Sequence, residues 1–477
     1  MQNTQEKTKQ PFTRRALKAH TWMGLFISAF MYIICLSGTI AVFHNEFERW
    51  EQPQIEETQE INTATAEQAF TTFIQRYKEA TGHYHLVFPT SGIPRLVVEN
   101  DHVAHFVNTD GSLGEIEQPH WTKMLVDLHL YLHLPNSIGV FIVSAFGGLL
   151  CAITLSGFLS HPRIIKDAFR LRAGGTGLQE NIDIHNRLSI WASPFHLMIG
   201  ITGAYFGLAG LLIVIFSQAF YGGDNQAVVD EVFAAEPKLE QPLQTANIKK
   251  ALQYVLDNDP HSNVLFLTVH EPNTPTQFIE IYVQKPQRLI YSENYRFSAN
   301  GEFLEVGNYE HGSAGKQIVF SFYRLHFGDF YGLTSKVLYF VLGIMLTIVS
   351  ATGINIWLNQ RKTKDIVNYT WPAIVWGTPL ALVISAWLNL FVHTRLDAVV
   401  WATLVIVSGY AYFQKNEVKF IAQIKAVLSI VILGFVATYA AIFNLSALSI
   451  ASLQINIPLI IFAIVLLARQ YAKRCHK

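Results

Sequence analysis

The chain has 477 residues, of which 51% are hydrophobic and only 15% are charged, and its formal net charge is zero. This composition is typical of an integral membrane protein. It lacks the basic excess that nucleic-acid binding requires, so we expect no nucleic-acid partner.

Apolar residues are gathered into eight stretches, each long enough to cross a lipid bilayer as a helix, which takes about 20 residues. The stretches lie near 21–43, 137–160, 188–219, 335–358, 371–392, 397–413, 426–444 and 448–468. The first follows the basic segment KTKQPFTRR and ends without a small-residue cleavage pattern, so we expect a retained helix and not a signal peptide. The sequence therefore predicts an α-helical integral membrane protein with about eight transmembrane helices.

Lysine and arginine are concentrated in alternate short segments. They occupy the N-terminal arm, the loops after the second, fourth and sixth stretches, and the tail RQYAKRCHK. In the loop after the second stretch they are Arg163, Lys166, Arg170 and Arg172. Because short cytoplasmic loops carry an excess of positive charge, we expect both termini in the cytoplasm and the two long loops outside it.

Each long outer loop is predicted to begin with a helix and to continue with strands. In the first, TAEQAFTTFIQRYKEATG has helical periodicity, and HYHLVFP, IPRLVVEN and HVAHFVNTDGSLGEIE are typical of strands with an Asp-Gly turn. The second repeats this order with NIKKALQYVLDND, NVLFLTVHE, QFIEIYVQ and RLIYSENYRFSANGEFLEV. Neither loop contains cysteine, so we expect two small α+β domains without disulfides.

A histidine and a glycine recur at one spacing in the first and third stretches. Gly38 follows His20 by 18 residues, and Gly203 follows His185 by 18 residues. Each of the two glycines comes directly after a hydroxyl residue. The match indicates an internal duplication.

The second and fourth stretches share a similar pair of residues. His129 lies 28 residues before Gly157, and His326 lies 27 residues before Gly353. The chain is therefore predicted to contain two copies of a unit made of a helix, an outer domain and a second helix.

The duplication gives the predicted domain organisation. The two copies cover about 12–172 and 180–362. The predicted segments are an arm and first helix (1–43), a first periplasmic domain (44–134), the second and third helices with their loop (135–219), a second periplasmic domain (220–325), the fourth helix (326–362) and a four-helix C-terminal region (363–477).

The four repeated histidines are candidate metal ligands. Parallel repeats are related by an axis along the membrane normal, so we expect His20 beside His185 at the cytoplasmic face and His129 beside His326 at the outer face. Imidazole is a normal axial ligand of haem iron, and helix bundles hold cofactors between facing side chains. The sequence therefore predicts two bis-histidine haem sites. Zinc is disfavoured because no Cys, Asp or Glu completes a tetrahedral set, and interfacial histidines preserved by duplication alone are the alternative.

Two further histidines are alternative ligands. His196 follows His185 by 11 residues, which on one ideal helix places it about 20° away and about 16 Å deeper. Either of these two could be the ligand on the third helix, and a hydrogen bond to a neighbouring helix is the structural explanation for His196. His133 follows His129 by four residues and lies on the same predicted face.

Several motifs resemble those of the PepSY-associated transmembrane family, which includes inner-membrane siderophore reductases. They are AHTWMGL, LSGTIAVFHNEFERW, DLHLYLHLP, DIHNRLS, RLHFGDFYG and TGINIWLNQRK, within about 12–362. One departure is Ser189, where the family usually has a glycine four residues after the histidine. The four C-terminal helices lie outside the resemblance.

The resemblance implies a bacterial inner-membrane oxidoreductase with two PepSY-like periplasmic domains. It would carry haem b, with two haems expected from the two histidine pairs, and pass electrons to a ferric siderophore or another ferric chelate in the periplasm. PepSY modules are also associated with protease inhibition and envelope sensing, so a binding or regulatory membrane protein is an alternative function. A transporter is a third, since the chain has repeats and polar residues within its helices.

No nucleotide-binding motif follows a predicted strand. The segment AGGTG at 173–177 lies in a basic loop and is interpreted as a connection. Electrons would therefore come from a quinol or a separate reductase. Arg187 and Arg324 lie near the predicted ligands and are candidate partners of haem propionates.

Overall fold

The computed structural model describes residues 11–161, 163–169 and 176–475. The basic loop residues Arg170 and Arg172, most of the AGGTG segment and the first part of the basic N-terminal arm lie outside the described residues.

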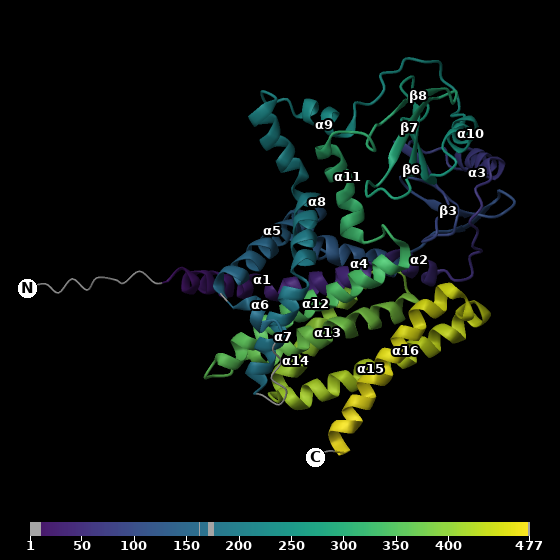
Figure 1. The fold of residues 1–477 in the computed structure, drawn as a ribbon. Helices are drawn as coiled ribbons and strands as arrows, with labels where there is room; N and C mark the ends of the chain where they lie inside the picture. The colour runs from purple at the N-terminus through teal and green to yellow at the C-terminus, as the bar shows by residue number, and fades with distance from the viewer. Residues whose placement is uncertain (1–10, 162, 170–175, 476–477) are drawn as a thin grey trace, which may run out of the picture.

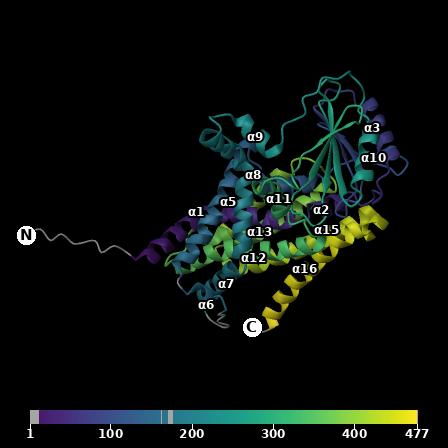
Figure 2. The ribbon, with the colours of Figure 1, turned by 45° about the horizontal axis from the view of Figure 1, so that its top comes forward.

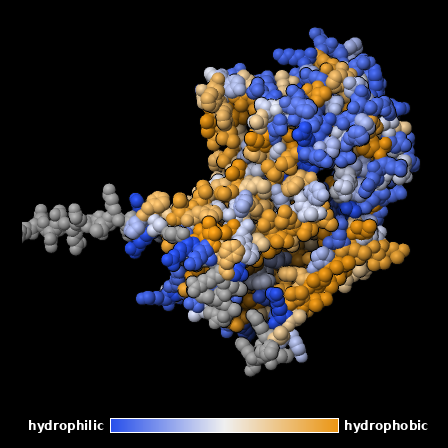
Figure 3. All heavy atoms as spheres, in the orientation of Figure 1, coloured by the Kyte–Doolittle hydropathy of each residue, from blue (hydrophilic) through white to orange (hydrophobic). Residues whose placement is uncertain are grey.

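The described part of the chain contains eight helices that are long and apolar enough to cross a membrane. They are α1 (Phe12–Ala41), α5 (Asn136–Ser160), α8 (Ser193–Phe220), α12 (Gly332–Gln360), α13 (Ile366–Asn389), α14 (Leu396–Gln414), α15 (Glu417–Phe443) and α16 (Ile450–Cys475). Apolar residues cover much of their outer surface in Figure 3, whereas polar residues cover the domain above them. The prediction of a multi-pass helical membrane protein is confirmed.

Four of these helices, α1, α5, α8 and α12, form the bundle built from the two repeats (Figure 1). Helix α5 packs on α8 at a position where glycines allow the backbones to meet. A Cβ atom added at Gly147 would lie 2.8 Å from the carbonyl oxygen of Gly200, and one at Gly200 would lie 2.9 Å from that of Gly147. Close packing of small residues is a common basis of helix association in membranes.

The C-terminal helices α13 to α16 pack on one another and against the short helix α2 (His44–Glu51). Trp50 of α2 stacks on Tyr439 of α15, with ring centroids 5.2 Å apart, and its indole N–H donates to Asn456 of α16. The C-terminal region therefore packs against and stabilises α2, the short helix that follows α1.

The two outer loops contribute four strands each to one antiparallel sheet, in the order β4-β3-β2-β1-β5-β6-β7-β8. The strands are β1 (His83–Val87), β2 (Val97–Asn100), β3 (Ala104–Val107), β4 (Leu113–Ile116), β5 (Asn263–His270), β6 (Phe278–Gln284), β7 (Glu293–Ser298) and β8 (Phe303–Val306). Strand β1 of the first loop pairs with strand β5 of the second, so backbone hydrogen bonds join the two predicted α+β domains into one sheet.

Two helices cover one face of this sheet, α3 (Thr63–Arg76) and α10 (Ile248–Asn258), which lie side by side in Figure 2. Each begins at an asparagine whose side chain accepts hydrogen bonds from the first turn, Asn62 for α3 and Asn247 for α10. The inward residues of both helices and of the central strands form one hydrophobic core. The predicted helix-then-strands order of each loop is therefore confirmed.

Shorter helices lie between the sheet segments and the long helices: α4 (His120–Tyr131), α9 (Asn225–Phe233) and α11 (Ala314–Phe327). Helices α6 (Ile164–Asp167) and α7 (Gly177–Trp191) lie between α5 and α8, and the 3-10 turn η1 (Asn444–Leu448) lies between α15 and α16. Helix α7 ends at Trp191 and α8 begins at Ser193, with Pro194 in its first turn. Because a proline cannot supply the backbone N–H that a continuous helix needs, the single helix predicted through His185 and His196 is interrupted.

Candidate functional site

Two cavities lie in the repeat bundle, and each contains one of the predicted histidine pairs. The first has a volume of about 430 Å³ and is lined by His20, His185 and His196 among mainly apolar residues. The second, of about 440 Å³, is lined by His129 and His326 and lies at the end of α1 next to the sheet domain. The structure therefore brings together the same pairs that the duplication predicted.

The first pair joins α1 to α7. The ring centroids of His20 and His185 are 6.3 Å apart, and the ring planes are nearly perpendicular, at 82°. The Nδ1 atom of His20 lies 3.0 Å from the carbonyl oxygen of Ile153, and the Nδ1 atom of His185 lies 3.1 Å from that of Val349. A carbonyl oxygen only accepts, so Nδ1 carries the proton in both rings and Nε2 keeps its lone pair.

The second pair joins α4 to α11. The ring centroids of His129 and His326 are 6.1 Å apart, with 34° between the ring planes. Nδ1 of His129 donates to the carbonyl oxygen of Ile34 at 2.9 Å, and Nδ1 of His326 contacts the Thr202 hydroxyl at 2.8 Å. Across the described residues, every hydrogen bond of the four paired rings is made by Nδ1.

The recurrent glycines lie against the histidines of the neighbouring helix in the first cavity. A Cβ atom added at Gly157 would lie 3.3 Å from Cε1 of His20, and one at Gly353 would lie 3.5 Å from Cε1 of His185. Each glycine is preceded by a hydroxyl residue, Ser156 or Thr352, that contacts Nδ1 of the same ring. The repeated hydroxyl-glycine sequence is therefore part of the histidine site.

The second cavity repeats this arrangement. A Cβ atom added at Gly203 would lie 3.2 Å from Cε1 of His326. At Gly38 it would overlap the ring of His129. Sequence spacing detected these glycines but assigned none of them to a particular ring, because each contacts a histidine from a different helix of its own repeat.

The ring separation of both pairs fits two imidazole ligands on one metal ion. Bonds of about 2.0–2.1 Å from a metal to two opposite imidazole nitrogens separate the ring centroids by about 6 Å, since each centroid lies only about 1 Å behind its nitrogen. A hydrogen bond donated by the other ring nitrogen, here Nδ1, is the usual support of a histidine that binds a metal. Among the described residues no three His, Cys, Asp or Glu side chains group around one point. The remaining donors would have to come from the bound group, as they do in haem.

Helix α4 is held in place by a buried carboxylate. Glu51 accepts hydrogen bonds from the backbone N–H groups of Trp121 and Thr122, in the first turn of α4, and from the Asn389 side chain of α13. A carboxylate at a helix N-terminus satisfies its free N–H groups. Helix α2 and the C-terminal region thus fix the helix that carries His129.

His133 is placed differently from the paired histidines. Its Nε2 lies 2.9 Å from the carbonyl oxygen of Met124, and its Nδ1 accepts a 3.1 Å hydrogen bond from the indole of Trp401. Both ring nitrogens are engaged, so in this arrangement His133 offers no lone pair to a metal and instead ties α4 to α14.

The two predicted propionate partners do not line either cavity. The Arg187 guanidinium lies over the ring of Trp191, 5.4 Å from its centroid, and donates to the carbonyl oxygen of Phe169. Arg324 is buried and donates to the carbonyl oxygen of Arg288 at 2.8 Å. Both arginines therefore make protein contacts in this structure.

His196 lines the first cavity but belongs to no pair. Only 2% of its surface is exposed, and Nε2 is buried without a hydrogen-bond partner among the described residues. A buried polar nitrogen without a partner is unfavourable, so a polar group bound in the cavity would fit this atom.

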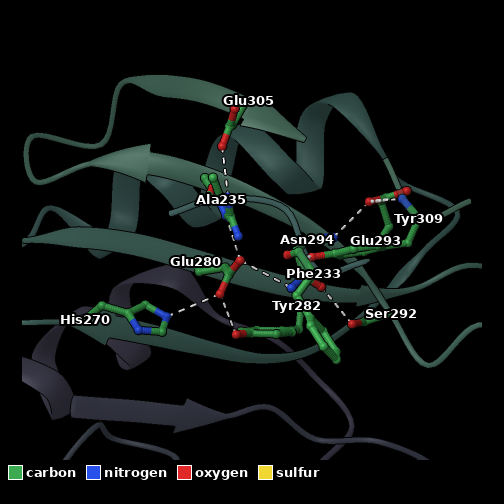
Figure 4. A network of polar contacts seen from close by, with 11 residues as sticks. Phe233, Ala235, His270, Glu280, Tyr282, Ser292, Glu293, Asn294, Glu305 and Tyr309 are labelled. Carbon is green, nitrogen blue, oxygen red and sulfur yellow. Dashed lines mark hydrogen bonds and ion pairs between the residues drawn. The ribbon is translucent and has the colours of Figure 1, made fainter. Parts of the chain in front are cut away.

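A separate polar network lies in the sheet (Figure 4). Glu280 of β6 accepts hydrogen bonds from Arg296 and Tyr282, and Nε2 of His270 lies 3.2 Å from its second oxygen. Burial alone would raise the pKa of this carboxyl, but the contacts with His270, Tyr282 and Arg296 outweigh it and lower the pKa to about 2. The network joins β5, β6 and β7 and is far from the paired histidines in sequence.

Comparison with known proteins supports the resemblance seen in the motifs. A curated relative from Pseudomonas aeruginosa, uncharacterized protein PA4219, is 30% identical over 116 residues, which is 24% of this chain and 29% of the relative. The match therefore spans less than a third of either protein. The sequence profile of the PepSY-associated TM region matches residues 17–360, which include nearly all of both repeats, all four paired histidines and the complete sheet. The chain belongs to the PepSY-associated TM family.

Proposed function

We propose that this protein is a haem-containing electron-transfer protein of the bacterial inner membrane, which reduces a ferric chelate on the outer side. One observation carries the proposal: four imidazoles meet in two pairs, with ring centroids 6.3 and 6.1 Å apart, and each has Nδ1 engaged and Nε2 available.

The chain's own residues would do four things for two bound haem groups. His20 with His185, and His129 with His326, would each hold one haem through their imidazole nitrogens, and the carbonyl and hydroxyl groups at Nδ1 would fix the tautomer of each ring. The glycines beside the rings leave room that a side chain would fill. The mainly apolar lining of the cavities would limit the access of water to these groups. When bound, haem supplies a one-electron couple at each end of the bundle.

The two sites lie at opposite ends of one helix. Helix α1 contributes His20 to the first cavity and Gly38 to the second, and 18 residues of helix rise by about 27 Å, which is close to the thickness of the hydrocarbon core. The lysines and arginines of the short loops favour a cytoplasmic first cavity and a periplasmic sheet domain. This arrangement suits electron passage from the inside to the outside.

A ferric siderophore or simpler ferric chelate is the proposed substrate. Hard anionic oxygen donors hold Fe(III) more tightly than Fe(II), so one electron delivered to the chelate weakens the complex and releases iron. The chain shows no nucleotide-binding motif, and a quinol or a separate reductase is the proposed electron donor.

The experiment is rapid mixing of the reduced, purified full-length protein with several ferric chelates, including ferric citrate and chemically distinct siderophores. We expect the absorption bands of the reduced haem to return to the oxidised form on mixing, in step with trapping of Fe(II). A gallium chelate of the same ligand is the matched control, because Ga(III) has similar size and charge but accepts no electron.

Two outcomes would refute the reductase function. If the protein contains haem but no ferric chelate oxidises it, the haem sites stand and the proposed substrate is wrong. Colourless protein from haem-sufficient cells would instead favour a binding or regulatory membrane protein, or a transporter.

A further inference from the structure

Three side chains form a wall between the two cavities. Met31 of α1, Leu150 of α5 and Leu346 of α12 are buried and line both cavities. The two cavities are therefore separated by a single layer of side chains at this point.

The wall follows the internal duplication. Leu150 and Leu346 are 196 positions apart, and so are Gly157 and Gly353, the glycines that contact the histidines of the first cavity. The two leucines are thus equivalent positions of the two repeats, and they meet where the repeats face each other.

The remaining wall position breaks this equivalence. His20 and His185 are 165 positions apart, and Met31 and His196 are also 165 positions apart. The second repeat therefore has an imidazole where the first has a thioether. Met31 lines both cavities, whereas His196 lines the first cavity alone.

His196 is buried in the first cavity and has a ring nitrogen that is unpaired among the described residues. It is 2% exposed, its Nε2 has no hydrogen-bond partner within the described ranges, and it lines the cavity of His20 and His185. The ligand positions of that cavity are already supplied by a pair whose ring separation fits one metal ion. His196 is therefore available for a different role.

We propose that His196 is a positioning residue that makes the two otherwise equivalent haem sites unequal, by placing a polar imidazole against the group bound in the first cavity. This inference rests on the proposed function. Hydrogen bonds and dipoles close to a haem are among the factors that set its reduction potential. In the mainly apolar lining of the first cavity little solvent screens such a dipole, and the methionine at the equivalent position offers none of comparable strength.

The consequence is a difference in potential between the two ends of the bundle. Two sites related by duplication, each with two histidines whose Nδ1 atoms are engaged, would have closer potentials without this group. A polar group that contacts only one of them separates the two potentials.

The experiment compares His196→Met, which restores the residue of the first repeat, with wild type in two backgrounds. The His129→Ala background retains only the first site, and the His20→Ala background retains only the second. Full-length proteins in detergent are titrated by spectroelectrochemistry, and haem per chain is measured on the same samples.

We expect His196→Met to keep haem in the first site and to shift its midpoint potential in the His129→Ala background, with a smaller shift or none in the His20→Ala background. His196→Gln keeps an N–H donor, so it should retain part of the difference between the midpoint potentials of the two sites that His196→Met removes. Haem retained in the second site reports that each variant is folded.

An unchanged potential in the His129→Ala background overturns the inference and leaves the haem sites intact. Loss of haem from the first site with His196→Met also overturns it, since His196 would then be a ligand. A wild-type protein without haem instead refutes the proposed function on which the inference rests.

Discussion

The hydroxyl of Thr202 on α8 lies 2.8 Å from Nδ1 of His326 on α11. Thr202 uses its own hydroxyl proton to donate to the carbonyl oxygen of Met198, at 2.8 Å. It can therefore only accept from His326, which fixes the proton on Nδ1 and leaves the lone pair on Nε2.

Replacing Thr202 by Val should weaken haem binding in the second cavity. Loss of the hydrogen-bond partner of a metal-binding histidine typically lowers metal affinity about 10–100-fold. Competition with a haem-scavenging apoprotein measures the rate at which haem leaves. Thr202→Ser keeps the hydroxyl and should behave as wild type, and equal release from the Val and Ser variants would contradict a role for this hydrogen bond.

The histidine pairs should behave as two units. We expect His20→Ala or His185→Ala to remove about half of the pigment, and the His20→Ala/His185→Ala double variant to lose no more than either single variant. His129→Ala or His326→Ala should remove the other half. Pyridine haemochrome assays on the purified proteins provide the measurement.

Four single variants that all retain both haems would show that the paired histidines are not the ligands. Loss of pigment from a double variant beyond that of each single variant would show that the two rings belong to different sites.

Adding one methyl group beside a proposed haem ligand should also reduce haem binding at that site. A Cβ atom at Gly38 would overlap the ring of His129, so Gly38→Ala should lower haem in the second cavity. Gly148 of α5 has open space where its Cβ atom would lie, so Gly148→Ala is the matched control. If both variants bound wild-type amounts of haem, His129 would not need the position that it has in this structure.

The Glu280 network should make the sheet domain sensitive to acid. A carboxyl whose pKa is lowered by folding, here to about 2 from an ordinary value of 4.5, contributes stability that is complete above pH 4.5 and is lost as the pH falls towards 2. The contribution is roughly 3 kcal/mol. Thermal unfolding of the full chain followed by tryptophan fluorescence should show this loss.

Glu280→Gln should unfold at lower temperature near neutral pH and lose less stability on acidification than wild type does. Glu302→Gln, at an exposed carboxyl between β7 and β8, serves as the control and should follow the wild-type curve. Parallel acid dependence of wild type and Glu280→Gln would show that Glu280 is not the titrating group.

Much of the arrangement could be predicted from the sequence because it is periodic. Apolar stretches of membrane length predicted all eight long helices, and equal spacing from His20 to Gly38 and from His185 to Gly203 predicted which histidines would be partners. Both signals depend on residue type and position alone.

Other features depend on contacts between distant segments, which no local pattern encodes. The pairing of β1 with β5 joins strands from different loops, and the carbonyl acceptors of Ile153 and Val349 are backbone atoms of neighbouring helices. Pro194 is a local signal for the break before α8, but the prediction placed His185 and His196 on one ideal helix without using it. Arg187 and Arg324 were close to the ligands in sequence, yet the structure turns both towards other partners.

The most direct test of the two haem sites is the haem content of the purified wild-type chain, from its absorption spectrum and its protein concentration. We expect two haem b per chain, with reducible bands and the low-spin spectrum of bis-imidazole ligation. Protein from haem-sufficient cells that is fully folded and contains no haem, or a single haem that survives replacement of all four paired histidines, would contradict the proposed sites.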